Sequence, residues 1–292
     1  MKPLKSPREL TMQIKHLQEH HNLQVDDMAY AIEMLSNVNY YRLSAYGIGL
    51  KNPNDKEKFI DGVSLNTLFR LYNFDCILRN ILMPTLENLE IQLRAKVAYR
   101  LAMTYGPDGF YDLKNFNVTT NKQGKNIHTR TIALFEKEVR KQQKLPFVFH
   151  HIKNYEGRFP IWVAVELFSF GMLSSFFSIM NFEDKKEVAK EFNTVPKYLQ
   201  SWIFALLEAR NRCAHYGRVY NMPLQHLPHL YSENRPYFSN RIFPLIITIK
   251  RMLGDSLTWN TFINKLIDLT NEYPEANLQC MGFPENWKEV LL

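Results

Sequence analysis

The chain has few of the residues that build turn-rich or disulfide-bonded folds. Its 292 residues include 11 glycines and 3 cysteines. Scarce glycine favours long helices, and neither sustained period-two alternation nor an Asn-Gly hairpin signal indicates strands. The widely separated Cys76, Cys213 and Cys280 form no disulfide framework and no zinc spacing. We therefore expect an all-α protein in the reducing cytoplasm.

The sequence also lacks the motifs of several large enzyme classes. No Walker loop, dinucleotide fingerprint or Gly-x-Ser-x-Gly elbow occurs, which excludes nucleotide-fuelled, dinucleotide redox and α/β-hydrolase chemistry. Two histidine pairs, His16 with His20 and His226 with His229, have no nearby cysteine and no His-Glu-x-x-His string. We predict no cofactor and no metal site.

Long hydrophobic runs are scarce as well. The N-terminus has no signal-peptide run. Residues 161–180 carry a single charge, Glu166, but serines interrupt them and no basic cluster flanks them. We interpret this segment as a buried helix and expect no membrane association.

The net charge of +7 suits an anionic partner. The densest positive tract lies between residues 122 and 144, where it either grips a phosphate backbone or forms a solvated face. Residues 39–46, with three tyrosines and an arginine, either stack on bases or form a wall of the core. The predicted RNA-binding residues are Lys122, Lys125, Arg130, Lys137, Arg140, Lys141, Lys144 and Arg42.

Apolar periodicity and capping residues predict a series of helices. A long helix from residue 64 should kink or restart at Pro84 and end at Tyr105. We expect residues 51–62 and 117–130 to be loops, His150 and His151 to lie in a loop, and 222–236 to be extended. The other predicted helices span 7–21, 26–37 with Asp26 as N-cap, a basic segment ending at Pro146, 161–180, 183–193, 196–216, 240–253, 257–273 and a tail from Pro284.

The stretch Arg210-Asn211-Arg212-Cys213-Ala214-His215 ends the helix that begins at Pro196. The apolar stripe of this helix runs directly into Arg210 and Asn211, although burying an unpaired guanidinium is costly. Arg210 and His215 are five residues apart, about 140° around the helix axis. One straight helix therefore does not aim both side chains at one point unless Arg210 reaches round or the helix frays at Gly217. Two copies related by a two-fold axis could instead form a composite pocket.

Arginine and histidine beside a phosphodiester suffice for RNA cleavage without metal. Histidine can remove the proton of the 2′-hydroxyl as it attacks phosphorus, and arginine offsets charge on the phosphoryl oxygens. Glu90 and Arg94 have the spacing of an intrahelical ion pair, which is either solvated or faces the Arg210 site and orients it. The predicted supporting residues are Glu90, Arg94 and Glu166.

Three blocks in order resemble the abortive-infection (Abi) proteins of the AbiD/AbiF type, which belong to the HEPN superfamily. The first runs from Lys2-Pro3 through Leu17 and then holds Asn39-Tyr40-Tyr41-Arg42-Leu43-Ser44-Ala45-Tyr46. The second holds Glu87-Asn88-Leu89-Glu90-Ile91-Gln92-Leu93-Arg94, with Tyr105-Gly106 after it. The third runs from Trp162 through Glu166 and Phe170-Gly171 to Arg210–His215 and Asn221. Ribonuclease members of that superfamily carry Arg-x4–6-His, which matches Arg210 and His215.

The resemblance implies a HEPN-like helical bundle over residues 1–225, with an N-terminal helical extension (1–62). Residues 226–292 match no motif of the family, and we expect them to form a C-terminal helical extension packed on this bundle. It further implies a homodimeric, metal-independent endoribonuclease toxin of prokaryotic anti-phage defence, with Arg210, Asn211 and His215 in the catalytic positions. RNA is then the substrate, and a structured noncoding RNA restrains the toxin as in some relatives. Two alternatives stay open: a non-catalytic RNA-binding regulator, and a helical protein that binds partners but no RNA.

Overall fold

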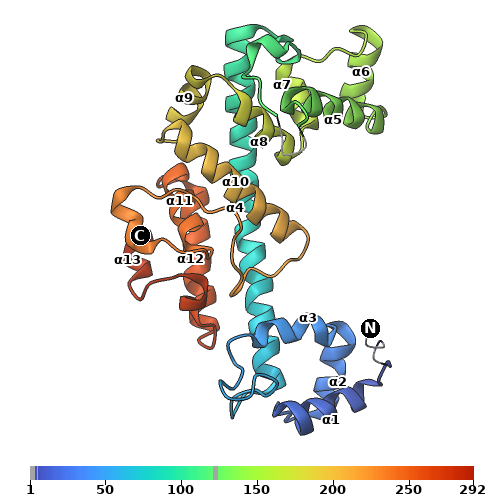
Figure 1. The fold of residues 1–292 in the computed structure, drawn as a ribbon, viewed down its shortest axis with the longest axis vertical. Coiled ribbons are helices and arrows are strands. Elements are labelled where there is room, and N and C mark those ends of the chain that lie inside the picture. Colours follow the sequence, from blue (N-terminus) through green and yellow to red (C-terminus); the bar gives the residue numbers. More distant parts are fainter. Residues whose placement is uncertain (1–3, 5, 121–123) are drawn as a thin grey trace.

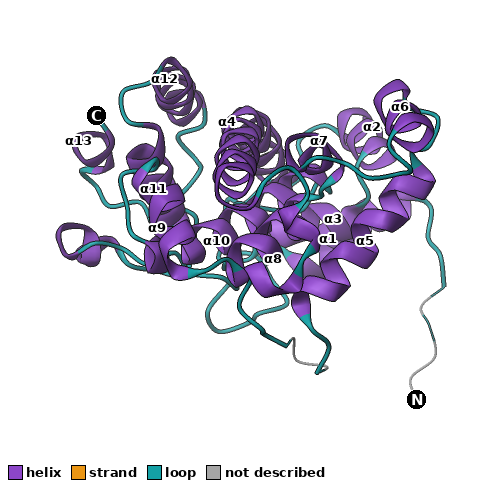
Figure 2. Ribbon diagram, turned by 90° about the horizontal axis from the view of Figure 1, so that it is seen from above, coloured by secondary structure: helices purple, strands orange, loops and turns teal. Residues whose placement is uncertain are grey.

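The structure, a computed structural model, describes residue 4, residues 6–120 and residues 124–292. All the regular elements in these ranges are helices, and extended residues meet only in isolated bridges. The view along the molecule in Figure 2 accordingly shows helices and loops but no strand. The predicted all-α class is confirmed, whereas the HEPN-like arrangement stays a prediction.

Helix α4 (Leu65–Tyr105) is the spine of the molecule (Figure 1). Ser64 caps its start by accepting a hydrogen bond from the backbone of Thr67, 3.1 Å away. Buried side chains recur every three or four residues, so the helix can pack along most of its length. It contacts α7, α9, α10 and α12. The buried leucines of this stripe are Leu65, Leu68, Leu71, Leu78, Leu82, Leu86, Leu89, Leu93 and Leu101.

Pro84 lies inside α4 without ending it. Of the two predicted alternatives, the restart is therefore wrong, and the kink stays a prediction. Proline removes the hydrogen bond to the carbonyl of the residue four positions earlier, which is Asn80. Both Pro84 and Asn80 are exposed, so water can solvate that carbonyl and the helix continues.

The N-terminal helices form a second hydrophobic cluster around the first turns of α4, with Ile14, Leu43 and Phe59 fully buried in it. They are α1 (Leu10–His21), α2 (Met28–Asn37) and α3 (Tyr40–Ser44). The cap of α2 is Asp27, which accepts a hydrogen bond from the backbone of Tyr30 at 3.0 Å. The prediction of Asp26 was wrong by one residue.

The other end of α4 is covered by short helices. They are α5 (Ile127–Lys141), α6 (Pro146–Asn154), α7 (Ile161–Ala164), α8 (Phe170–Ile179) and α9 (Phe182–Lys190). The predicted single helix over 161–180 is wrong, because it breaks after the 3₁₀ turn η4 (Val165–Leu167), where Ser169 caps α8. Two predicted loops were also wrong in part: α5 begins at residue 127, where Asn126 caps it, and both His150 and His151 lie in α6.

Helix α10 (Pro196–Ala214) crosses the middle of α4, and the C-terminal helices pack beside it. These are α11 (Phe243–Leu253), α12 (Leu257–Glu272) and α13 (Trp287–Leu291). The predicted extended segment 222–236 is correct up to residue 231, where the 3₁₀ helix η5 (Ser232–Tyr237) follows. The remaining 3₁₀ helices are η1 (Ala45–Gly47), η2 (Gly109–Tyr111), η3 (Leu113–Asn115) and η6 (Leu278–Met281).

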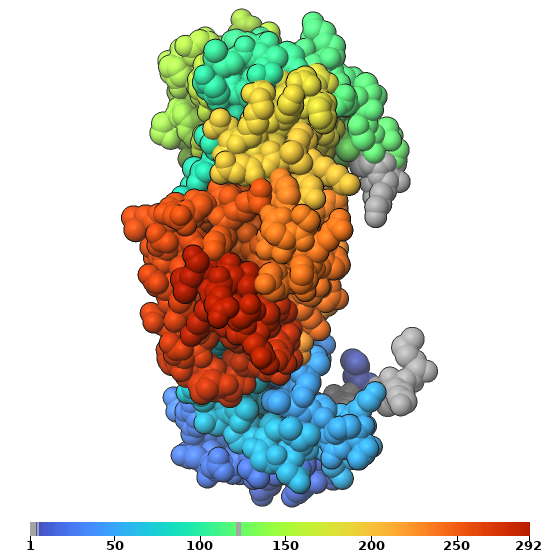
Figure 3. Space-filling model, turned by 90° about the vertical axis from the view of Figure 1, so that its left-hand side faces the viewer, coloured from blue at the N-terminus to red at the C-terminus, as the bar shows by residue number. Residues whose placement is uncertain are grey.

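The molecule is elongated, and Figure 3 shows its segments arranged along the long axis. The N-terminal helices α1 to α3 lie at one end, and the C-terminal helices α11 to α13 cover the middle. Helices α5 to α9 lie at the other end. The C-terminal segment packs on the rest through α12 against α4 and α11 against α10. The division into 1–225 and 226–292 stays a prediction. None of the helices in the described ranges is long and apolar enough to cross a membrane.

Candidate functional site beside the end of helix α10

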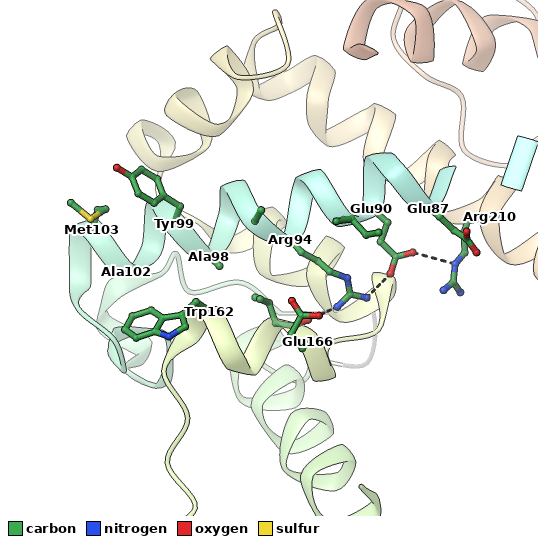
Figure 4. A pocket seen from close by; sticks show the side chains of 13 residues that line it. Glu87, Glu90, Arg94, Ala98, Tyr99, Ala102, Met103, Trp162, Glu166 and Arg210 are labelled. Atoms are coloured by element: carbon green, nitrogen blue, oxygen red, sulfur yellow. Dashed lines mark hydrogen bonds and ion pairs between the residues drawn. The ribbon is translucent and has the colours of Figure 1, made fainter. Parts of the chain in front are cut away.

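A cavity of about 800 Å³ runs along α4 near the end of α10 (Figure 4). Arg210 is the residue of α10 that lines it. All three predicted supporting residues, Glu90, Arg94 and Glu166, line it as well, so the fold brings them together with Arg210. The full lining is Glu87, Glu90, Ile91, Arg94, Ala95, Ala98, Tyr99, Ala102, Met103, Trp162, Val165, Glu166 and Arg210.

Glu90 links the two arginines of the cavity. Its side chain is 6% exposed, and its Oε1 accepts a 2.5 Å hydrogen bond from Nη2 of Arg94. Its Oε2 lies 3.2 Å from Nε of Arg210, an ion pair whose geometry is not that of a hydrogen bond. Arg94 also donates to the carbonyl of Val165. The Glu90–Arg94 pair is therefore buried, not solvated, and it reaches Arg210, but its part in catalysis stays a prediction.

His215 lies outside this cavity. It caps the C-terminus of α10, where its backbone N–H donates to the carbonyl of Asn211 at 3.0 Å. Tyr216 then adopts a positive φ of 56°, which ends the helix. The His215 side chain is exposed and makes no hydrogen bond or ion pair to the described residues. One copy of the chain thus does not bring Arg210 and His215 into one pocket. This agrees with the prediction from their five-residue separation on a helix.

The other residues of this stretch have structural partners. Burial raises the pKa of the Cys213 thiol to about 12, so it is protonated at neutral pH and unsuited to nucleophilic attack. Arg212 pairs with Glu208 at 2.7 Å, and Glu208 also accepts backbone hydrogen bonds from Gln225 and His226. Asn211 places Oδ1 3.4 Å from Nη1 of Arg210. Of the two arginines in this stretch, Arg210 lines the cavity and Arg212 does not.

A buried aspartate, which the sequence analysis missed, fixes the segment after His215. Asp75 is fully buried on α4, and its Oδ1 accepts hydrogen bonds from the backbones of Val219 (2.9 Å) and Tyr220 (2.7 Å). Its Oδ2 accepts from the Tyr46 hydroxyl at 2.6 Å and from Arg79. The sequence did carry a signal, because Asp75 occupies a position of the α4 apolar stripe, four residues after Leu71 and three before Leu78.

The tyrosine-rich N-terminal cluster divides between core and surface. Tyr46 is buried, which agrees with the core interpretation, whereas Tyr41 is 86% exposed. Arg42 is exposed, and its guanidinium donates to the carbonyl of Tyr216, so the fold brings this predicted RNA-binding residue next to His215. Arg218 similarly donates to the carbonyl of Ala45. The N-terminal helices therefore border the end of α10.

The predicted basic tract does not line the cavity. Arg130, Lys137, Arg140 and Lys141 are exposed on α5, and Lys144 follows it. Lys125 precedes α5 and is exposed, and Lys122 lies outside the described residues. Arg140 lines a second cavity of about 420 Å³ together with Tyr111 and Arg158. Arg158, which the sequence analysis did not select, is ion-paired with Asp108 at 2.7 Å.

Among the described residues, no group of three or more histidine, cysteine, aspartate or glutamate side chains has the arrangement of a metal site. In the first histidine pair, the rings of His16 and His20 are tilted by 48° to each other, with their centroids 4.6 Å apart. In the second pair, His226 contacts Glu208 at 3.1 Å. The residues that can act on a ligand at the α10 end are therefore arginine, histidine, asparagine and carboxylates.

Replacing Glu90 by glutamine is expected to lower stability by about 1–3 kcal/mol, because it leaves Arg94 and Arg210 beside each other without a buried carboxylate. Urea unfolding measures this loss. Glu191→Gln is the matched control, since Glu191 pairs with Lys96 at 3.0 Å but its side chain is 62% exposed. Surface ion pairs contribute about 0–1 kcal/mol. Equal losses in both variants would show that Glu90 does not fix the two arginines.

The fold and the site define an all-α protein whose central helix holds an ion-paired arginine beside a cavity. A protein-family model described as Abi-like protein matches residues 33–221, more than half of the chain. The chain therefore belongs to the Abi-like family, and this family points to abortive infection. The matched range contains Glu90, Glu166, Arg210 and His215. No curated protein and no solved structure gives a significant match.

Proposed function

We propose that the protein is a metal-independent endoribonuclease toxin of an abortive-infection system. One observation carries the proposal: Glu90 holds Nε of Arg210 at the cavity, while the His215 imidazole, five residues later, is exposed and unpaired among the described residues. Arginine provides a fork of donors for a phosphodiester, and histidine exchanges a proton near neutral pH. Cytoplasmic RNA is the substrate in this proposal.

The chemistry needs only these side chains. Neutral His215 removes the proton of the ribose 2′-hydroxyl, and that oxygen attacks the adjacent phosphorus. Arg210 stabilises the charge that develops on the non-bridging oxygens, and Asn211 helps to hold its guanidinium. The bond between phosphorus and the 5′-oxygen breaks, and that oxygen takes up a proton from water, which leaves a 2′,3′-cyclic phosphate and a 5′-hydroxyl. Arg42, beside Tyr216, can contact a neighbouring phosphate.

The site is completed by a second copy in this proposal. Arg210 lines the cavity but His215 of the same chain does not, so a two-fold dimer would supply the histidine of one copy to the arginine of the other. The exposed cations of α5 would contribute sequence-independent affinity for the RNA backbone. A structured noncoding RNA that restrains the toxin would use the same cations.

A second candidate function is a regulator that binds RNA without cutting it. The separation of His215 from the Arg210 cavity within one chain favours this function if the protein acts as a monomer. Glu90 also neutralises part of the Arg210 charge, which weakens its action on a transition state. The two functions differ in whether RNA is broken, and RNA retained on purification would separate both from a protein that binds no RNA.

Purified protein incubated with cellular RNA in the presence of EDTA is expected to produce new ends that carry a 2′,3′-cyclic phosphate. The 2′-hydroxyl route forms this product and requires no metal, whereas metal-activated water would leave a linear phosphate. Sequencing that captures cyclic-phosphate ends measures the outcome. Cleavage that disappears with EDTA would contradict the proposed chemistry, and intact RNA bound to the protein would favour the regulator.

A further inference from the structure

The part of the cavity that lies away from Arg210 is apolar and open. Trp162 is 54% exposed, Tyr99 is 69% exposed and Met103 is 69% exposed, although large apolar side chains usually avoid water. Figure 4 shows the Trp162 ring beside Ala98 and Ala102, with Glu166 between it and Arg94. An exposed aromatic ring beside small side chains suits a planar ligand that can stack on it.

The charges of the cavity exclude phosphate from this part. Its lining contains two arginines against three glutamates, on a chain whose net charge is +7. Glu90 pairs with both arginines, and the pair with Arg210 lies at the end of the cavity away from Trp162. Glu166, which lies between Trp162 and Arg94 in Figure 4, is exposed and has no ion pair or hydrogen bond among the described residues. An RNA backbone would be repelled here, whereas a neutral group that donates hydrogen bonds would be attracted.

We propose that Trp162 and Glu166 bind one unpaired base of the RNA and that they select guanine. This inference takes its ligand class from the proposed function. Proteins read single-stranded RNA by stacking bases on aromatic side chains and by hydrogen bonding their Watson–Crick edges. A carboxylate only accepts hydrogen bonds. Guanine presents two adjacent donors, N1–H and N2–H, to the two oxygens of Glu166, whereas uracil presents one.

The arrangement of the two residues fits this role. Trp162 lies on α7 and Glu166 on the 3₁₀ turn η4 that continues it, four residues later, so both side chains face the same cavity. Along α4, the alanines beside Trp162 are eight and twelve residues from Glu90, which corresponds to about 12–18 Å. The bound base therefore belongs to a nucleotide near the cleaved phosphate, not to the one that Arg210 contacts, and it sets sequence preference.

The full-length His215→Ala protein allows a direct test, because it should bind RNA without cutting it. Of the four tryptophans, Trp202, Trp259 and Trp287 are at most 5% exposed, so the RNA-dependent emission change should come from Trp162. The probes are oligouridylates that carry one central guanosine, inosine or uridine. Guanosine should quench the emission and bind about tenfold tighter than inosine, which lacks the N2–H donors.

A second substitution, added to the His215→Ala protein, tests whether Trp162 and Glu166 are the residues that bind the base. Trp162→Phe should remove the emission change and weaken binding, and Glu166→Gln should bind the guanosine and inosine probes equally. Phe238→Ala is the control, because Phe238 is 56% exposed but lies outside this cavity, and it should keep both affinities. Equal affinity of the three probes, or an unchanged preference in Glu166→Gln, would overturn the inference. A Trp162 emission spectrum that shifts as protein concentration rises, and does not respond to RNA, would also overturn the inference. It would mean that a second copy of the chain covers Trp162.

The inference and the proposed nuclease can fail separately. Cyclic-phosphate products from the wild type without any preference for guanosine would leave the nuclease standing and overturn the base site. Guanosine-selective quenching with no RNA cleavage would keep the base site and refute the nuclease. Absence of binding to all three probes would overturn the base site.

Discussion

Replacing His215 by alanine is expected to abolish RNA cleavage and growth arrest while the fold persists. Loss of a positioned acid–base group typically lowers a rate by about 10²–10⁴-fold. The side chain is exposed, and the hydrogen bond that it makes as the cap of α10 comes from its backbone. Stability should therefore change by no more than about 0.5 kcal/mol. Growth of a bacterial host, mapping of RNA ends and a thermal melt measure the three outcomes.

The melt decides how a loss of activity is interpreted. A variant that no longer melts cooperatively would have lost activity through misfolding, which would remove the support for a catalytic histidine. A folded variant that still produces cyclic-phosphate ends would contradict the assignment directly. Host growth equal to that of the wild type, with identical RNA ends, would favour the RNA-binding regulator.

Mixing two inactive variants tests whether the site is shared between copies. Arg210→Ala and His215→Ala should each be inactive alone. In a mixed dimer, one of the two composite sites combines the intact arginine of one copy with the intact histidine of the other. Random mixing should restore about a quarter of the wild-type rate if the site is composite. No recovery in a confirmed mixed dimer would show that both groups must come from the same chain.

The second large effect is expected at a residue that takes no part in the proposed chemistry. Asp75→Ala should destabilise the protein by about 3–5 kcal/mol, because it leaves the guanidinium of Arg79 buried without a counter-charge. It also leaves the Tyr46 hydroxyl and two backbone N–H groups without their acceptor. Since those N–H groups belong to Val219 and Tyr220, the segment after His215 should lose its anchor on α4. Urea unfolding measures the effect.

Two further variants show whether the charge or a single hydrogen bond matters. Tyr46→Phe removes one donor to Asp75 and should cost about 1 kcal/mol. Asp268→Ala replaces an exposed aspartate on α12 and should change stability by less than about 0.5 kcal/mol. An Asp75→Ala protein with the unfolding midpoint of the wild type would mean that the network does not hold the segment.

Local signals predicted most helices but not their ends. The apolar stripe of α4 was visible in its leucine spacing, and the predicted start at residue 64 agrees with Ser64 as the cap of this helix. Residues 161–180 looked like one helix because they are almost uniformly apolar, and uniform apolarity hides a break. The continuity of α4 through Pro84 depended on which face meets water, which spacing alone does not reveal.

The sequence by itself determined the all-α class and the angular separation of Arg210 and His215. Both follow from local backbone geometry: scarce glycine with helical periodicity, and a fixed rotation for each residue of a helix. Only the tertiary structure decided that Glu90 joins Arg94 to Arg210, that Asp75 anchors the chain after His215, and that Trp162 stays exposed beside Glu166. The contacts of Glu90 with Arg210 and of Asp75 with Val219 join residues 120 or more positions apart in the sequence. The packing of α10 and of the segment after it against α4 creates both contacts.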